Sequence, residues 1–350
     1  MPELIPINSL RLEALEAELA GMGEPRYKAE QIFKWLSQGV TSFDEMTNVS
    51  KALRAKLAEH FYIEKIEILT KQCSKLDGTV KYLFGLQDGN SIETVLMKYR
   101  HGYSICISTQ AGCKMGCVFC ASFEKGATRN LTAGEILLQV IRASIDSGCR
   151  ISNIVLMGTG EPLDNYDNVM TFLDLVSHEK GVNIGMRHIS LSTCGLVPRI
   201  YELAELKKQL TLSISLHAPN NEIRSKIMPV NKKYDIESLI EACKVYFEKT
   251  GRRISFEYAM IAGVNDSRDC AFELARLLRG FNCHVNLIPL NHVEGSPLKP
   301  STRQDLAAFQ KILEDHHITT TVRRQHLGAD IDASCGQLRR RMLARRENIQ

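Results

Sequence analysis

Hydrophobic residues at helical spacing mark the first part of the chain. Leu12, Leu15 and Leu19 recur every three or four residues, which places them on one face of a helix. The same spacing continues in two further sets, Ala29, Ile32, Phe33 and Leu36, and then Leu53 and Leu57 behind a capping Ser50. The pattern predicts a small helical N-terminal domain over residues 1–61.

The pattern changes to short extended runs between residues 62 and 100. These runs are IEKIEILT, TVKYLFGL and SIETVLMKY, and they are interrupted at Asp77-Gly78 and Asp88-Gly89. Asp-Gly is a dipeptide typical of the tight turns between hairpin strands, because glycine adopts the backbone angles that such turns need. We expect a β-hairpin extension over residues 62–100 that links the helical domain to the rest of the chain.

A regular alternation of strands and helices follows from residue 101. Six apolar strand candidates are separated by stretches of helical length: YSICIST, ISNIVLMG, HISLST, LTLSISLH, RISFEYAMI and HVNLIPL. Such alternation predicts parallel strands joined by right-handed crossovers, in an open doubly wound sheet or in a barrel of the TIM type. The α/β core should cover residues 101–325, with chemistry at the carboxyl ends of its strands, before a C-terminal segment, 326–350.

Composition agrees with an ordinary globular protein. The chain has 350 residues, of which 44% are hydrophobic and 24% charged, and no run approaches the ~20 apolar residues of a membrane span. The first residues, MPELIPINSL, lack the pattern of a secretory signal, so we expect a cytoplasmic protein without membrane contact. In that compartment the eleven cysteines indicate metal binding or catalysis rather than a disulfide framework.

Positive charge gathers near the end of the chain. The net charge is only +4, but LRRRMLARRE contains five arginines, Arg339, Arg340, Arg341, Arg345 and Arg346. Such a run forms either a solvated helix face or a surface that contacts phosphate groups. It is compatible with an RNA partner.

The most specific motif directly follows the first core strand. Cys113, Cys117 and Cys120 have the spacing C-x3-C-x2-C in AGCKMGCVFCA. Three thiolates on one loop can bind three irons of a cubane cluster, which leaves the fourth iron open to chelate a small molecule. Zinc is the alternative, but structural zinc takes four ligands and no fourth Cys or His lies close by in the sequence.

This loop, with Phe119 before its last cysteine, resembles that of the radical S-adenosylmethionine (SAM) superfamily. One strand later, residues 158–162 read GTGEP, similar to the glycine-rich segment that holds the amino group of SAM in that superfamily. The resemblance implies a [4Fe-4S] cluster on the three cysteines, SAM bound at Gly160 and Glu161, and a partial (β/α)6 radical SAM barrel with the N-terminal domain and hairpin extension attached.

The same resemblance implies further SAM contacts. Ser192 lies in LST, Ser215, Leu216 and His217 form SLH, and Asn291 ends PLN. All of them are at or just beyond predicted strand ends, where barrel active sites are built. The alternative for each polar residue is a turn cap or an internally satisfied position.

Four other segments narrow the resemblance to the RlmN/Cfr family of RNA methyltransferases: DIDASCGQL with Cys335, ISLHAPNNEIRSKIMPVNKKY, GEPRYKAEQIFKWL and ETVLMKY. Members methylate adenine 2503 of 23S ribosomal RNA, and the RlmN branch commonly also methylates adenine 37 of tRNA. The resemblance implies a methyltransferase that consumes two SAM per turnover, takes electrons from a flavodoxin-like donor, acts as a monomer and binds RNA with its N-terminal domain.

The family mechanism assigns roles to three residues. One SAM methylates the thiol that Cys335 matches, and a second yields the 5′-deoxyadenosyl radical that removes a hydrogen from this methyl group, so that the carbon adds to adenine. Cys106 matches the thiol that releases the RNA by forming a disulfide, and Glu93 matches the base that removes the ring proton. The alternatives are a buried strand cysteine at position 106 and a solvent-facing carboxylate at position 93.

The two branches of the family differ in the adenine carbon that they methylate, C2 for RlmN and C8 for Cfr. NLIPLN at residues 286–291 is closer to the RlmN form, so we predict C2, although Leu290 replaces the usual aromatic residue and Cys194 the usual Ser or Ile. Competing hypotheses are a radical SAM enzyme acting on a protein or small molecule, such as a glycyl-radical activase, and an iron–sulfur electron carrier. The carrier requires a fourth cluster ligand.

Overall fold

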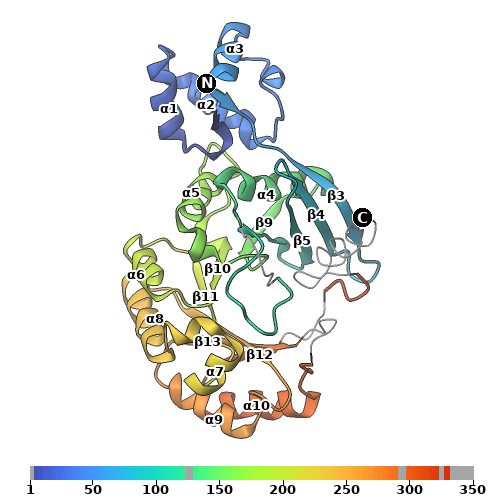
Figure 1. Ribbon diagram of the computed structural model, residues 1–350, viewed down its shortest axis with the longest axis vertical. Coiled ribbons are helices and arrows are strands. Elements are labelled where there is room, and N and C mark those ends of the chain that lie inside the picture. The colour runs from blue at the N-terminus through green and yellow to red at the C-terminus, as the bar shows by residue number, and fades with distance from the viewer. Residues whose placement is uncertain (1–3, 123–128, 291–296, 323–326, 332–350) are drawn as a thin grey trace.

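A ten-stranded sheet forms the centre of the molecule (Figure 1). The computed structural model describes residues 4–122, 129–290, 297–322 and 327–331. The strand order is β14-β13-β12-β11-β10-β9-β6-β5-β4-β3, so neighbours in sequence are mostly neighbours in the sheet. In these ranges no helix is both long enough and apolar enough to cross a membrane.

The N-terminal part of the chain is helical and stands at one end of the molecule (Figure 1). Its helices are α1 (Leu12–Gly21), α2 (Arg26–Ser37) and α3 (Lys51–His60), with 3-10 turns at Ile7–Ser9 and Phe43–Glu45. The hydroxyl of Ser50 caps α3 by accepting a hydrogen bond from the backbone N–H of Leu53 (3.2 Å), as its position before the apolar repeat predicts. Two short parallel strands that the sequence pattern did not indicate, β1 (Ile5–Pro6) and β2 (Phe61–Tyr62), close this region.

The hairpin strands do not form a separate unit. β3 (Ile66–Cys73), β4 (Val80–Leu86) and β5 (Ser91–Tyr99) pair antiparallel with one another, and β5 then pairs antiparallel with β6 (Gly102–Cys106). Since β6 is also the first strand of the parallel series, the extension continues the central sheet. Side chains of the hairpin strands therefore lie on the same sheet faces as side chains of the core strands.

The remaining strands of the sheet are parallel and alternate with helices. The strands that follow β6 are β9 (Ile151–Leu156), β10 (Ile189–Thr193), β11 (Thr211–Ser215), β12 (Ile254–Met260), β13 (Cys283–Pro289) and β14 (Thr319–Val322). The helices are α4 (Ala133–Ser147), α5 (Tyr166–Ser177), α6 (Val197–Glu205), α7 (Asn221–Ile227), α8 (Ile236–Thr250), α9 (Arg268–Leu277) and α10 (Arg303–Asp315). The predicted α/β fold is confirmed. A small two-stranded sheet, β7 (Gln110–Ala111) with β8 (Arg129–Asn130), and 3-10 turns at Pro162–Asn165, Met186–His188 and Pro229–Lys232 complete it.

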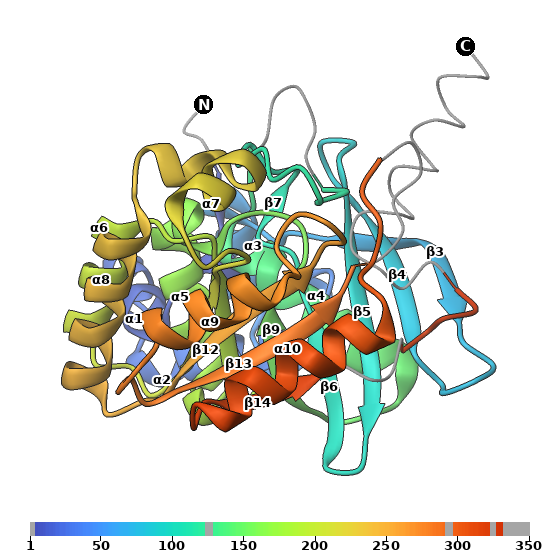
Figure 2. The same ribbon diagram turned by 90° about the horizontal axis from the view of Figure 1, so that it is seen from below.

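Strand alternation gives the central sheet a helix-covered face and an inner face (Figure 2). The hydroxyl of Thr94 on β5 donates to the side chain of Gln139 on α4 (2.8 Å), and the ring of Tyr258 on β12 packs against Phe309 of α10 with centroids 5.2 Å apart. Residues adjacent to these in sequence, such as Glu93 and Glu257, consequently point to the inner face.

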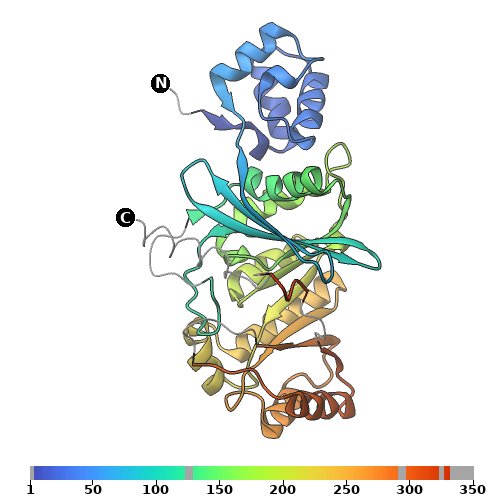
Figure 3. The same ribbon diagram turned by 90° about the vertical axis from the view of Figure 1, so that its right-hand side faces the viewer.

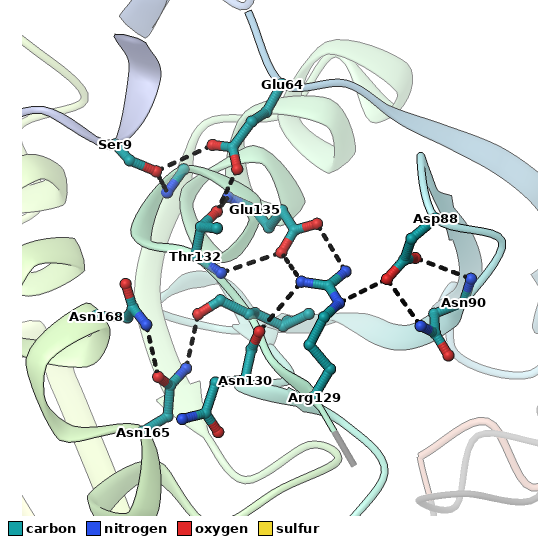
Figure 4. A network of polar contacts seen from close by, with 12 residues as sticks. Ser9, Glu64, Asp88, Asn90, Arg129, Asn130, Thr132, Glu135, Asn165 and Asn168 are labelled. Carbon is teal, nitrogen blue, oxygen red and sulfur yellow. Dashed lines mark hydrogen bonds and ion pairs between the residues drawn. The ribbon is translucent and has the colours of Figure 1, made fainter. Parts of the chain in front are cut away.

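A buried carboxyl joins the N-terminal region to the core (Figure 4). Glu64, 3% exposed, accepts hydrogen bonds from the hydroxyls of Ser9 (3.0 Å) and Thr132 (2.6 Å). Thr132 caps α4 in a reciprocal capping box with Glu135, and the backbone N–H of Gly134 donates to the Ser9 hydroxyl (2.8 Å). Glu64 thus lies beside the N-terminus of α4, where the helix dipole favours negative charge. Figure 3 shows the N-terminal helices standing beyond α4 at this end.

An arginine extends this network to the hairpin turn (Figure 4). Arg129 donates to both carboxylate oxygens of Glu135, at 2.8 and 2.9 Å, and its Nε lies 2.6 Å from the carboxylate of Asp88. Asp88 in turn accepts two hydrogen bonds from Asn90 in the same turn. The start of α4 is therefore tied to both the N-terminal region and the β4–β5 turn.

The titration of Glu64 should make the stability of the junction between the N-terminal region and α4 depend on pH. Burial raises the pKa of Glu64 from 4.5 to about 7. The folded protein therefore binds the proton of the Glu64 carboxyl more tightly than the unfolded chain does. The stability that this proton contributes to the folded state is complete below pH 4.5 and is lost as pH rises through about 7. Relative to Glu64→Gln, the natural chain should lose on the order of 3 kcal/mol of unfolding free energy across this range.

Denaturant unfolding at several pH values measures this difference. The single tryptophan, Trp35, lies on α2, so its fluorescence reports the N-terminal region directly. Equal pH slopes for the natural chain and the Glu64→Gln variant would contradict the assignment.

Candidate active site at the carboxyl ends of the strands

Two glycines bring the loop after β9 against the loop after β6. The N–H of Gly158 donates to the carbonyl oxygen of Ile107 (3.0 Å), and a Cβ on Gly158 would lie 2.6 Å from that same oxygen. Gly160 has φ +106°, and a Cβ there would lie 2.6 Å from the Cβ of Gln110. The backbones approach so closely that only glycine fits at either position. This explains both glycines of the GTGEP segment.

Glu161 joins the loops after β9 and β10. Its side chain is 4% exposed and accepts hydrogen bonds from the backbone N–H groups of Cys194 (2.7 Å) and Leu163 (3.1 Å). Burial raises the pKa of Glu161, and the two N–H donors oppose this effect. Its backbone N–H also donates to the side chain of Gln110 (2.8 Å). Glu161 thus shapes the loop that carries Gly160.

Ser108 links β5 to the same glycine-rich loop. Its hydroxyl donates to the carbonyl oxygen of Glu93 (2.7 Å) and accepts from the backbone N–H of Thr159 (3.0 Å). The side chain of Asn165 holds the neighbouring backbone by donating to the carbonyl oxygens of Thr109 and Leu131, both at 2.8 Å. Glu93 is therefore anchored, through its backbone, directly beside the GTGEP segment.

His217 is a neutral, buried side chain at the end of β11. Its Nδ1 accepts a hydrogen bond from the backbone N–H of Ala259 (2.9 Å), and burial lowers the pKa of His217 to about 3. The backbone has φ +56°, a left-handed conformation that is uncommon for a residue with a side chain. The ring packs edge-on against Phe119 of the cysteine loop, with centroids 4.8 Å apart.

A fully buried arginine forms hydrogen bonds with the backbone at the ends of β10 and β11. Arg224, on α7, is 0% exposed and donates to the carbonyl oxygens of Cys194 (2.7 Å), Leu216 (3.1 Å) and Ser215 (3.2 Å). Its remaining nitrogen donates to the side chain of Asn231 (3.0 Å). Burial lowers the pKa of Arg224, yet guanidinium groups remain charged in proteins. The ends of β10 and β11 are thereby joined through one cation.

The three motif cysteines share one half-buried loop. Burial raises the pKa values of Cys113 and Cys117 to about 12, and the nearby sulfur of Cys120 adds to both shifts. The loop is anchored where the N–H of Val118 donates to the carbonyl oxygen of Ile227 (3.0 Å). The three thiols are therefore close enough to influence one another electrostatically.

This donor set fits a cubane cluster. Among the described residues, no group of three or more His, Cys, Asp or Glu side chains is arranged to hold a single metal ion. A cubane attaches each cysteine to a different iron, so its thiolates need not converge on one point. Met115, Cys117 and Phe119 of the loop pack against an apolar group, Cys194, Ala218, Ile227, Met228 and Ile261, which would keep water from a cluster there. Leu290, at the position where an aromatic residue is usual, packs with the same group.

Glu93 and Cys106 lie on the inner face of the sheet. Glu93 is 4% exposed, so the solvent-facing alternative is wrong, and its carboxylate lies 2.8 Å from the Nζ of Lys81 on β4. Val95, two residues after Glu93 on β5, points to the same side as Glu93. It pairs with Lys81 on β4 and with Cys106 on β6, and paired residues on neighbouring strands point to the same side. The side chains of Lys81, Glu93 and Cys106 therefore share one face. The side chain of Cys106 is half-buried.

The same register places Ser192 and Ser215 on this face. Cys106 pairs with Val155 of β9, and Val155 pairs with Ser190 of β10. Ser192 lies two residues beyond Ser190 and therefore points to the same side. It pairs with Ser213 of β11, so Ser213 and, two residues later, Ser215 point to that side as well. The strand-borne residues expected from the sequence are thus brought to one surface.

Two expected site residues lie outside the described part of the chain. They are Asn291 and Cys335, and the arginines from Arg339 to Arg346 lie outside it too. Sequence reasoning also missed Lys81 and Arg224. A signal for Lys81 existed, since it interrupts the buried run TVKYLFGL, whereas Arg224 lies in the polar stretch NEIRSK, where an arginine is ordinary.

Comparisons with known proteins agree with this geometry. Residues 107–275 match the model of the radical SAM superfamily, and residues 5–63 match that of the ribosomal RNA large subunit methyltransferase N-terminal domain. A probable dual-specificity RNA methyltransferase RlmN of Alkaliphilus oremlandii is 55% identical over 97% of this chain and 99% of its own. The chain belongs to the RlmN family of radical SAM methyltransferases. The family predicted from the sequence, and with it a methyltransferase, is confirmed.

Other relatives of this RlmN-family chain extend the agreement to structure. The probable RlmN of Clostridium novyi is 52% identical over 95% of this chain and 97% of its own. The crystal structure of a radical SAM methyltransferase from Sphaerobacter thermophilus is 45% identical, covers 95% of this chain and 98% of that one, and superposes with a TM-score of 0.88. Membership implies the superfamily's [4Fe-4S] cluster and SAM, which the cysteine loop and the GTGEP loop fit.

The close approach of the two loops can be tested at Gly158. Gly158→Ala should lower the unfolding free energy by about 1–3 kcal/mol, because its Cβ would overlap the backbone of Ile107. Iron retention should fall with it, since the displaced backbone leads into the cysteine loop. Gly185→Ala is the control, because its Cβ would meet only His188, at 3.9 Å. Thermal unfolding and iron analysis that fail to separate the two variants would contradict the prediction.

Proposed function

We propose that this protein is a dual-specificity RNA methyltransferase that methylates C2 of adenine 2503 in 23S ribosomal RNA and also adenine 37 of tRNA. The observation that supports this most directly is the placement of Glu93 and Cys106 on one face, beside the GTGEP loop. The family's methyl transfer through a protein thiol needs a base and a second thiol next to bound SAM. The relatives named as dual-specificity RNA methyltransferases support the choice of RNA.

The cofactors are assigned by donor chemistry. Cys113, Cys117 and Cys120 would hold the cluster, which when bound supplies the electron that cleaves SAM to methionine and a 5′-deoxyadenosyl radical. SAM would be held by Gly160, Glu161, Ser192, Asn291 and the segment Ser215–His217. Two SAM molecules would be used in each turnover. An external, flavodoxin-like donor would supply electrons. The protein would act in the cytoplasm as a monomer.

The chain's own residues then release the methylated base. Cys335 carries the methyl carbon, which loses a hydrogen atom to the 5′-deoxyadenosyl radical and then becomes bonded to C2 of adenine. The unpaired electron of this adduct would return to the cluster, and the carboxylate of Glu93 accepts the proton that C2 loses. The thiolate of Cys106 attacks the sulfur of Cys335, and the carbon–sulfur bond breaks with its electron pair on carbon. That carbon takes a proton and becomes the methyl group, while the two sulfurs are oxidised to a disulfide. An external thiol reductant restores both thiols.

The site of methylation can be read from the product. Ribosomal RNA and tRNA from a strain lacking this protein should contain unmodified adenine at both positions, and complementation should restore 2-methyladenine. Mass spectrometry of nuclease fragments measures nucleotide and carbon together. Finding 8-methyladenine in the complemented strain would replace the C2 assignment with C8, and unchanged RNA in both strains would contradict RNA methylation altogether.

The paired thiols predict two different failures. Cys335→Ala should abolish methylation while 5′-deoxyadenosine is still formed, because only the methyl carrier is lost. Cys106→Ala should accumulate protein covalently bound to RNA, visible on a denaturing gel, because adduct release is blocked. Cys73→Ala, a change at an exposed thiol on β3, serves as the control. Purified Cys106→Ala protein without attached RNA counts against the mechanism.

A further inference from the structure

Lys81 occupies a position that apolar packing would normally fill. Its side chain is 0% exposed on β4, next to Tyr82, which is also 0% exposed, and its Nζ lies 2.8 Å from the carboxylate of Glu93. By contrast, Lys71 on the neighbouring β3 pairs with Asp146 while both side chains remain partly exposed, at 37% and 27%. The Lys81–Glu93 pair is removed from water, and the surface pair is not.

Stability alone gives no reason for such a pair. Burying two charges costs several kcal/mol for each ion, and a well-packed apolar pair of similar volume is usually as stable or more stable. The pair is also placed on the inner face, rather than on the face covered by α4. Lys81 is in one cross-strand row with Val95 and Cys106, and Glu93 is in the next row on the same face. A buried pair that adds little stability, on the same face as the thiol proposed to release the RNA, points to a role in the reaction.

We propose that Lys81 is a positioning residue that keeps the carboxylate of Glu93 ionised, and directed along the inner face, so that it can accept the proton from adenine. This rests on the proposed function. A carboxyl taken out of water without a cation keeps its own proton and cannot accept another. A lysine within hydrogen-bond distance reverses that preference.

On the neighbouring strands β4 and β6, the described side chains near Glu93 single out Lys81 for this role. From β4 the charged side chain on its face is Lys81, and from β6 the titratable side chain in the adjacent row is Cys106. The residue that follows Glu93, Thr94, turns away to the Gln139 side chain on α4. The backbone carbonyl of Glu93 accepts from Ser108, which fixes the strand without adding charge. The pairing of β4 with β5 thus places the cation of Lys81 against the carboxylate of Glu93.

Replacing Lys81 by methionine tests this role, since methionine has a similar length and suits a buried strand. In single turnovers with an RNA fragment, Lys81→Met should form 5′-deoxyadenosine and the covalent adduct as the natural enzyme does. Release of methylated RNA should be at least about tenfold slower near pH 7, and raising the pH should recover part of the rate. Lys81→Arg should restore release, because it returns the positive charge.

Matched variants separate this role from a structural one. Lys71→Met removes the exposed lysine of the neighbouring strand and should leave release and its pH profile unchanged. Combining Lys81→Met with Glu93→Gln should give no slower release than Glu93→Gln alone, because both changes remove the same ionised carboxylate. If Lys81→Met does not fold, Lys81→Gln is measured in the same way.

The outcomes distinguish the two proposals. If Glu93→Gln releases RNA normally, the assignment of Glu93 as the base fails, and the proposed function must change. If Glu93→Gln accumulates adduct while Lys81→Met and Lys81→Gln release RNA at the natural rate and pH dependence, the role of Lys81 is overturned. Additive losses in the double variant, or no rescue by Lys81→Arg, also overturn it.

Discussion

The alternation of side chains across one continuous sheet is the constraint on which the site depends. Because paired residues on neighbouring strands point to the same side, the register carries one face from β4 across β5 and β6 to β11. Lys81, Glu93 and Cys106 come from the antiparallel hairpin region and the first core strand, whereas Ser192 and Ser215 come from the parallel core. A shift of one residue in any of these pairings would turn its side chains toward the helices.

Close backbone contacts at the strand ends complete this arrangement. Gly158 and Gly160 allow the loop after β9 to touch the loop after β6, and Glu161 then connects it to the end of β10. Arg224 joins β10 to β11 through carbonyl oxygens. Loops that would otherwise move independently are thus held by buried polar groups, and each of these groups is costly to remove because its partners would be left unsatisfied.

Buried charge is concentrated where parts of the molecule meet. Glu64 lies between the N-terminal region and α4, Lys81 and Glu93 lie on the inner face of the hairpin strands β4 and β5, and Arg224 links the ends of β10 and β11. Ions in these places gain specific directions from their hydrogen bonds, at the expense of desolvation. The N-terminal region is tied through Glu64 to the helix that follows the cysteine loop.

By itself, the sequence determined the class of fold, the family and the chemistry of the site, since helical spacing, strand–helix alternation and the C-x3-C-x2-C and GTGEP motifs are local patterns. It indicated Glu93 and Cys106 only through resemblance, because an isolated strand residue carries no local sign of its partner. Tertiary structure alone decided that the hairpin joins the main sheet, that Lys81 meets Glu93, and that Arg224 is buried. The first two depend on strand register, and the third depends on α7 packing against the ends of β10 and β11. Neither leaves a local pattern in the sequence.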